Sequence, residues 1–250
     1  MATTIEAEIK QEKTVEEVKE DQLEVEVKED VVTNQEKEKE NEVVKEEKEE
    51  EVKMEVEPNT GVNFPVQTAD GKQLDAMGVR KKRVIALNVS IYGFGIYGDN
   101  DKLKELLKSK FEKAPENPTK ELYEAVIDGD VGLMARLVIV FPGLTMNMVR
   151  KNFDEALGAM IKKLNGGQKD DELAKRLMGD ARDSIKLSSG SVIEITRLPG
   201  YTLQTKVKDE VISTVESELL CRAYFHLYLG EDPLDKNAKE KFGAAMLSLF

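Results

Sequence analysis

The amino-acid sequence predicts an α+β domain, in which helices pack on one face of a large antiparallel β-sheet. Its expected order is strands, helices, a strand, helices, a hairpin and helices, unlike the strict strand–helix alternation of a parallel sheet. A Pro199–Gly200 turn between the alternating segments 191–198 and 201–207 is a strong hairpin signal. The nearly all-apolar run at residues 133–141 predicts a strand that is buried on both faces.

The first half of this domain is expected to begin with strands and continue with short helices. Residues 74–88 and 90–97 are rich in Val, Ile and aromatic side chains, and predict a hairpin or one long bent strand. Asn88 marks the turn or a bulge. Residues 99–111 carry apolar side chains at helical spacing, and residues 119–127 predict a second short helix.

The second half is expected to be mostly helical around the hairpin. Residues 145–164 predict a long amphipathic helix, which Gly166 and Gly167 end. A further helix is predicted at residues 170–185. Residues 211–229 and 237–249 predict the closing helices.

Charge divides the 250-residue chain into two parts. Of its 49 acidic and 37 basic residues, residues 1–57 hold 22 and 9, which leaves 27 and 28 for residues 58–250. The first part has no glycine and no aromatic residue. Such a segment cannot bury enough apolar surface to offset an ordering entropy of ~1–2 kcal/mol per residue. We therefore expect a disordered acidic Glu/Lys-rich tail at residues 1–57 and one folded domain at residues 58–250.

The composition also indicates in which cellular compartment the protein is expected and which classes of partner it is expected to bind. The single Cys221 excludes an intrachain disulfide, and the acidic N-terminal region is unlike a transit peptide. We expect a cytoplasmic protein, with the chloroplast as the alternative. No run approaches the ~20 apolar residues of a membrane-spanning helix. The near-neutral domain predicts no nucleic-acid partner. Two interpretations of the tail stay open: a solubilising segment, or an acidic arm that binds a partner protein.

Several chemical classes lack their motifs. Neither a phosphate-binding loop nor a dinucleotide fingerprint is found. One cysteine and one histidine cannot assemble an ordinary zinc site. His226 lies in an apolar helical segment and is interpreted as structural rather than as a catalytic base. We therefore expect no metal site and no cofactor, and we assign no catalytic residue.

The most informative segment is residues 80–98, RKKRVIALNVSIYGFGIYG. Arg80 and Tyr92 fall on the two expected paired strands, within a largely apolar stretch. A guanidinium can pair with a carboxylate through two hydrogen bonds, and a phenol can add a third. The two residues indicate a pocket for the carboxylate or enolate end of a long or flat apolar molecule. The competing interpretation is a strand-edge arginine and a core tyrosine.

This segment, read as GVRKKRVIALNVSIYGFGIYGD, resembles the chalcone isomerase superfamily, whose members carry a G-x-R strand before a second strand of similar pattern. The stretch VRKNFDEALGAMIKKL resembles the long helix of that fold, and VESELLCRAYFHLYLGEDPLDKNAKEKF resembles its C-terminal helix pair. The resemblance covers residues 61–250. It implies the chalcone-isomerase-like fold, a large antiparallel sheet with helices on one face.

Within the resemblance, the catalytic positions are poorly retained. The true isomerases use an arginine, a threonine, a tyrosine, an asparagine and a C-terminal Ser or Thr. Here these positions fall at Arg80, Tyr92, Met148, Glu155 and Cys221, so that only the arginine matches. The non-catalytic plant fatty-acid-binding branch keeps the arginine and carries a tyrosine at the position of Tyr92.

The resemblance therefore favours a non-catalytic binder of a fatty acid or similar amphipathic carboxylate. Arg80 and Tyr92 would hold the head group, and Met148 and Cys221 are the further ligand-binding candidates. Methionines suit a flexible apolar chain, whereas ring closure needs a rigid polar array, in which Met148 cannot donate. Two alternatives remain: a chalcone–flavanone isomerase, which is an intramolecular lyase acting on a flavonoid precursor, or a non-catalytic modulator of flavonoid enzymes. We lean against an enzyme.

Overall fold

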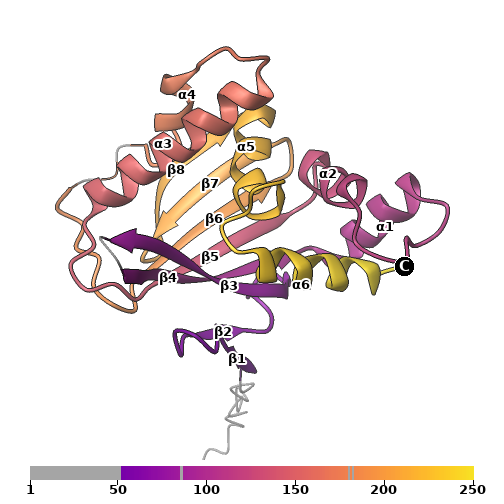
Figure 1. Ribbon diagram of the computed structural model, residues 1–250, viewed down its shortest axis with the longest axis horizontal. Coiled ribbons are helices and arrows are strands. Elements are labelled where there is room, and N and C mark those ends of the chain that lie inside the picture. The colour runs from indigo at the N-terminus through magenta and orange to yellow at the C-terminus, as the bar shows by residue number, and fades with distance from the viewer. Residues whose placement is uncertain (1–51, 85–86, 180, 182) are drawn as a thin grey trace, which may run out of the picture. The chain divides into compact units, whose positions relative to one another are not determined.

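The computed structural model of the protein describes residues 52–250 except residues 85–86, 180 and 182 (Figure 1). Most of the predicted acidic tail lies outside the described residues. Two short strands near its end are described: β1 (Met54–Val56) pairs antiparallel with β2 (Asn63–Pro65). Ordered structure therefore begins before the boundary that the charge pattern predicts.

A six-stranded antiparallel sheet forms the centre of the fold, and each strand pairs with its neighbours in sequence. The α+β prediction is confirmed. The expected hairpin at residues 74–97 is also confirmed, and its turn lies outside the described residues. The strands are β3 (Gln73–Val84), β4 (Leu87–Gly98), β5 (Leu133–Ile139), β6 (Val192–Leu198), β7 (Thr202–Val207) and β8 (Glu210–Glu216).

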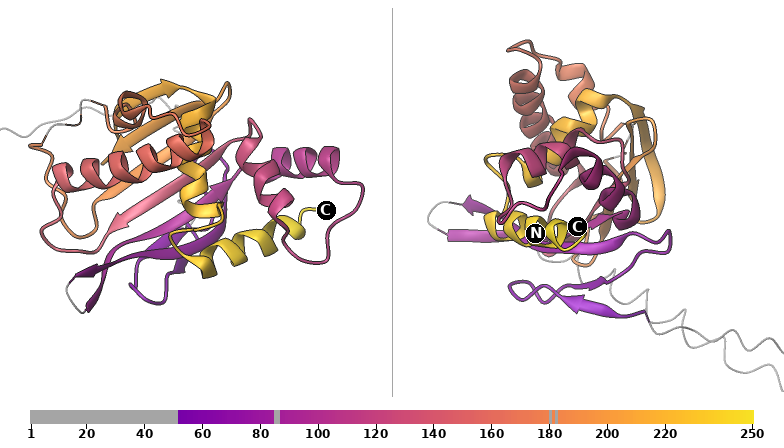
Figure 2. Two further views of the ribbon diagram at one scale, coloured as in Figure 1. Left: turned by 45° about the horizontal axis from the view of Figure 1, so that its top comes forward. Right: turned by 90° about the vertical axis from the view of Figure 1, so that its right-hand side faces the viewer.

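The helices cover one face of this sheet and one of its ends (Figures 1 and 2). Helix α3 packs on α4 and α5, α2 packs on α1 and α5, and α6 lies against β3. No helix of the described residues is long and apolar enough to cross a membrane. The helices are α1 (Asn100–Lys110), α2 (Lys120–Asp128), α3 (Met146–Leu164), α4 (Asp171–Lys175), α5 (Glu218–Leu229) and α6 (Lys236–Leu247).

The apolar core lies between the sheet and the helices. Side chains alternate along β6 and β7, so that Ile193, Ile195 and Leu203 are buried while their neighbours are half-exposed. Six of the seven residues of β5 are buried, as expected for a strand covered on both faces. Helix α5 is buried along most of its length and is the central helix of the layer.

The helix expected at residues 170–185 is wrong beyond its first turns. Asp170 caps α4, but the helix ends at Lys175 and turns follow. Gly179 has a φ of +46°, and a Cβ built on it would lie 2.8 Å from the carbonyl oxygen of Ile212. The left-handed backbone and the close approach of β8 both prevent a continuous helix here.

The helix expected at residues 211–229 is also wrong in its first part. Val211 belongs to β8, the edge strand, which pairs with β7. Lys208 and Asp209 both have positive φ angles, as a tight hairpin turn requires. The β-branched residues of this strand favour an extended backbone, and Ser217 caps α5 only after it.

On the face opposite the helices, the β1–β2 hairpin lies against β4. Gly93 and Gly95 of β4 point to this side, and their missing side chains leave room for Thr60, Val62 and Phe64. Phe64 is fully buried as a result.

A buried carboxylate locks the turn between β1 and β2. The Glu57 side chain accepts hydrogen bonds from the backbone N–H groups of Asn59 and Thr60, at 3.1 and 2.8 Å. It also accepts from the Asn59 amide at 2.8 Å and the Thr60 hydroxyl at 2.6 Å. These bonds lower the pKa of Glu57, although burial opposes them. Glu57 therefore stays ionised at neutral pH and holds the turn.

Gly95→Ala is expected to destabilise the protein. Its Cβ would lie 2.8 Å from the Tyr97 ring and 3.0 Å from both Leu74 and Phe64. Overpacking of this kind costs about 1–3 kcal/mol, measured as the free energy of unfolding in urea. The control is Gly158→Ala on α3, where the nearest atom is 3.4 Å away and the better helix former should stabilise by up to ~1 kcal/mol. Equal stability of the two variants would contradict the close packing at Gly95.

A second buried carboxyl, Asp75, lies at a β-bulge in β3. Burial raises its pKa to about 7, which the hydrogen bond from the Asn100 amide at 2.9 Å only partly offsets. Asp75 Oδ2 and Asn100 Oδ1 have no hydrogen-bond partner among the described residues, and both lie over Gly98. A proton on Asp75 would let the carboxyl donate to Asn100 and satisfy both oxygens.

Stability should fall as the pH rises from about 4 to about 7 because of Asp75. An unfolded aspartate ionises near pH 4, whereas the folded one keeps its proton to about pH 7, so rising pH favours the unfolded state. Asp75→Asn should remove up to ~4 kcal/mol of this loss, measured by urea unfolding between pH 4 and pH 8. Asp101→Asn, at an exposed carboxyl of α1, is the control. Parallel pH curves for wild type and Asp75→Asn would refute this assignment.

Candidate functional site

A second β-bulge, between β3 and β4, shapes the candidate site. Arg80 pairs directly with Tyr92, but the next pair is Lys81 with Ser90, so Ile91 is an extra residue on β4. Consecutive side chains of a regular strand point to opposite faces, whereas a bulge can turn two of them to one face. Ile91 and Tyr92 both line the same pocket.

The end of β5 holds the bulge in place. The carbonyl oxygen of Ile91 accepts the backbone N–H groups of Val140 and Phe141, each at 3.1 Å. The extra residue therefore does not leave its carbonyl without a partner. Satisfied backbone groups make the bulge a defined structure rather than a loose one.

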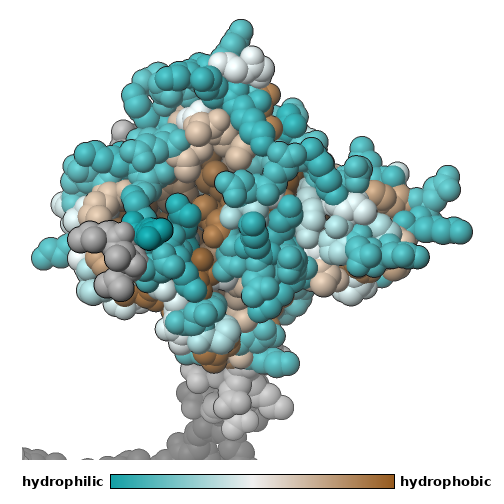
Figure 3. All heavy atoms as spheres, viewed as in Figure 1, coloured by the Kyte–Doolittle hydropathy of each residue, from teal (hydrophilic) through white to brown (hydrophobic). Residues whose placement is uncertain are grey.

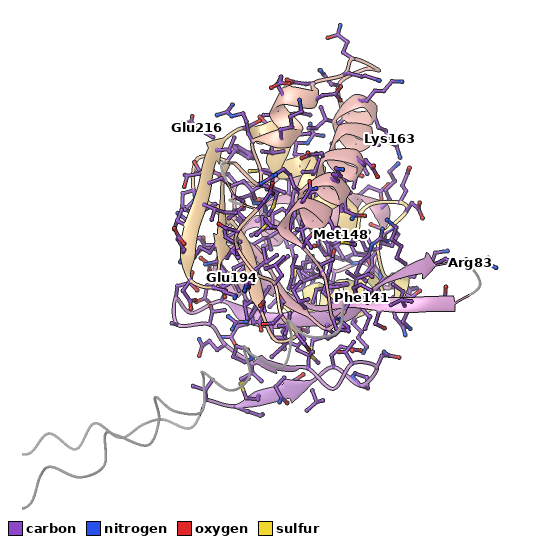
Figure 4. All side chains as sticks on the ribbon, turned by 90° about the vertical axis from the view of Figure 1, so that its left-hand side faces the viewer. Arg83, Phe141, Met148, Lys163, Glu194 and Glu216 are labelled. Carbon is purple, nitrogen blue, oxygen red and sulfur yellow. The ribbon has the colours of Figure 1, made fainter. Side chains whose placement is uncertain are left out.

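The pocket lies between this hairpin and helix α3, with a volume of about 90 Å³. Figure 3 shows apolar side chains gathered in a hollow on this face of the molecule. Met148 is 43% exposed, and in Figure 4 it lies above Phe141, while Arg83 lies at the projecting end of β3. The walls are mainly apolar, and the lining residues are Arg80, Lys82, Ile91, Tyr92, Leu144, Met148, Val149, Asn152, Phe153, Ala156, Leu227 and Leu234.

Arg80 differs from the other buried or half-buried arginines. Arg136, Arg150 and Arg222 each pair with a carboxylate. The fully buried Arg197 donates to three backbone carbonyls at 2.7–2.9 Å. Arg80 is half-buried in the pocket wall and has no acceptor among the described residues. Its guanidinium is thus available to an acceptor that enters the pocket.

Tyr92 lies directly opposite Arg80 in the pairing of β3 with β4. Burial raises its pKa, and the charge of Arg80 and a hydrogen bond with Tyr228 partly offset that rise. The Tyr228 hydroxyl lies 3.2 Å from that of Tyr224, and burial raises the pKa of both phenols well above its usual value. Tyr92 therefore stays protonated at neutral pH and can donate a hydrogen bond.

The structure brings three of the four candidate residues together. Arg80, Tyr92 and Met148 line the pocket, but Cys221 does not. Cys221 is fully buried, and its thiol donates to the carbonyl oxygen of Tyr201 at 3.1 Å. It lies about 9 Å along α5 from Leu227, the residue that this helix contributes to the lining. Cys221 therefore lies outside this pocket, and its assignment as a ligand-binding residue stays a prediction.

Two polar residues of the pocket are absent from the sequence prediction. Lys82 follows Arg80 by two positions on the strand, and Asn152 follows Met148 by four on the helix. These spacings place each on the same face as its predicted neighbour and could have identified it. Asn152, and not the predicted Glu155, provides the amide of the pocket.

No metal centre is found in the part of the chain that the structure describes, where no group of three His, Cys, Asp or Glu side chains could hold an ion. His226 is buried, with its Nε2 3.6 Å from Glu124, and burial lowers its pKa. It lies outside the pocket lining, which agrees with a structural histidine.

Comparisons with known proteins identify relatives of this chain in sequence and in fold. No family model matches the chain. It is 55% identical over 199 residues to chalcone isomerase-like protein 1 of Humulus lupulus, covering 79% of this chain and 93% of the relative. It is 36% identical over 191 residues to fatty-acid-binding protein 1 of Arabidopsis thaliana, covering 75% and 68%. The crystal structure of an Arabidopsis thaliana fatty-acid binding protein matches with a TM-score of 0.73 at 35% identity, covering 79% of this chain and 98% of that one.

Cys221 is expected to be inert toward thiol reagents in the folded protein. Burial raises the pKa of its thiol to about 12, and the nearby charge of Arg197 only partly offsets this. Because the thiolate is the reactive form, disulfide exchange with a colorimetric reagent at pH 8 should be at least ~100-fold slower than in urea-unfolded protein. Equal rates in the two states would show that the thiol is accessible.

Proposed function

Because this chain belongs to the chalcone isomerase superfamily, close to its fatty-acid-binding branch, we propose that it is a non-catalytic binder of a fatty acid or similar amphipathic carboxylate. Arg80 and Tyr92 hold the carboxylate, and the apolar walls of the pocket receive the beginning of the chain.

The unpaired guanidinium of Arg80 carries this proposal. A charge that is half-buried among apolar side chains is costly unless an acceptor pairs with it. A carboxylate offers two oxygens, so it can accept from Arg80 and also from the Tyr92 hydroxyl on the facing strand. The pairing of Arg80 with Tyr92 supports a shared head-group position, which would fix the orientation of the ligand.

The size of the pocket limits how the ligand is held. A volume of about 90 Å³ is well below the ~300–1,000 Å³ of typical small-molecule sites. A long acyl chain therefore enters only if wall side chains move. Met148 is half-exposed at the wall and unbranched, which suits it to such a movement.

The same geometry argues against ring closure of a chalcone. An isomerase needs fixed donors around a developing enolate. The position of its helix tyrosine is Met148, which cannot donate, and Cys221 lies outside the pocket. The alternative of a modulator that docks through the acidic tail concerns residues outside the described part of the chain.

Arg80→Ala is expected to weaken dodecanoate binding by at least ~1.5 kcal/mol, about tenfold, as for the loss of a charge-assisted hydrogen bond. Isothermal titration calorimetry of the full chain measures the affinity of each variant for dodecanoate. The matched control is Arg83→Ala, an exposed arginine on the same strand that does not line the pocket and should leave the affinity within about twofold. Unchanged affinity in Arg80→Ala, or an equal loss in both variants, would reject this head-group site.

A further inference from the structure

A second polar pair lies in the pocket beside Arg80 and Tyr92. Lys82 is two residues beyond Arg80 on β3 and lines the same pocket. Its Nζ donates to Asn152 Oδ1 on α3 at 3.1 Å. The Asn152 amide in turn donates to the carbonyl oxygen of Met148 at 2.6 Å. The lysine therefore reaches from the hairpin to the helix.

Lys82 is exposed, and of the described lysines it is the one that lines this pocket. Like most lysines of the described residues it has no carboxylate partner, but its ammonium group is oriented by a neutral amide. An ammonium group has three N–H donors, so one bond to Asn152 leaves two for another acceptor. Its positive charge is not neutralised where it lines the pocket.

The distance between Arg80 and Lys82 along β3 determines which kind of head group can pair with both. Residues two apart on a strand have Cα atoms ~6.6–7 Å apart and point to the same face. Arg80 and Tyr92 together satisfy one carboxylate, so that Lys82 remains available to a second acceptor a few ångströms away. A simple fatty acid has only one charged group and leaves the second cation unused.

We propose that Lys82, positioned by Asn152, is a second anion-binding residue, and that the pocket selects amphipathic ligands with two negatively charged groups at the polar end. This inference rests on the proposed binding function and narrows its ligand class. One carboxylate pairs with Arg80 and Tyr92, and the other pairs with Lys82. The apolar chain then lies against the methionine and phenylalanine side chains of α3.

The test compares dodecanoate with 2-dodecylsuccinate, a dianion with a similar chain, by calorimetry on the full-length protein. The wild type should bind the dianion about tenfold more tightly, as for one additional charge-assisted hydrogen bond at a partly solvated site. Lys82→Met should remove this preference, so that the affinity for the dianion falls about tenfold more than the affinity for dodecanoate. Lys81→Met is the matched control, because Lys81 neighbours Lys82 on the strand but does not line the pocket.

Asn152→Ala separates positioning from general destabilisation. It removes the acceptor that orients Lys82, so the ratio of dianion affinity to dodecanoate affinity should fall. A loss of folding would lower the affinities for both ligands together. The unfolding temperature of the variant shows whether it is folded.

The possible results distinguish the two proposals. If the wild type binds neither ligand, the proposed function fails, and this inference fails with it. If it binds both equally and depends on Arg80, the carboxylate site stands and the role of Lys82 is rejected. Equal losses in Lys82→Met and Lys81→Met would also reject it, because the effect would then come from net charge alone.

Discussion

The extra residue at Ile91 is the constraint on which the candidate site depends. Without it, strand alternation would turn Ile91 to the opposite face of the sheet from Tyr92, and one wall of the pocket would be lost. The bulge also falls immediately beside the pairing of Arg80 with Tyr92, so the guanidinium and the phenol are set at the last regular position before the strand changes register. The backbone N–H groups of Val140 and Phe141 donate to the carbonyl oxygen of Ile91, and these two hydrogen bonds stabilise the bulge without any ligand.

The molecule uses its arginines in two ways. Arg197 lies fully buried, and each of its three side-chain nitrogens donates to a carbonyl oxygen at the end of α2 or just beyond it, which ties that helix to β6. Burial lowers its pKa to about 10, which leaves it charged at neutral pH. Arg80 lies half-buried in the mainly apolar wall of the pocket and keeps its donors available. The contrast separates an arginine that completes the fold from one suited to a ligand.

Periodicity in the sequence predicted most of the fold, because alternation and helical spacing record which face of each element is buried. It failed where long-range contacts override local preference. Gly179 packs against β8, so the chain does not continue as a helix beyond α4, and residues 211–216 join the sheet instead of extending α5. In the site, Arg80 and Tyr92 could be inferred from their place on paired strands. Cys221 could not be placed, since an error of two helical turns along α5 moves a side chain about 10 Å. The bulge leaves no clear mark in the sequence, which is why Ile91 was not identified.

The β1–β2 hairpin packs on Gly93 and Gly95 of β4, and this packing limits how far the N-terminal region can be removed. The two glycines face the opposite side of β4 from Tyr92. A chain trimmed at the change in charge, between residues 57 and 58, loses both β1 and the carboxylate of Glu57 that closes the turn. The trimmed protein would uncover Phe64 and remove the backing of β4. The last residues of the acidic region thus support the strand that carries one wall of the candidate pocket.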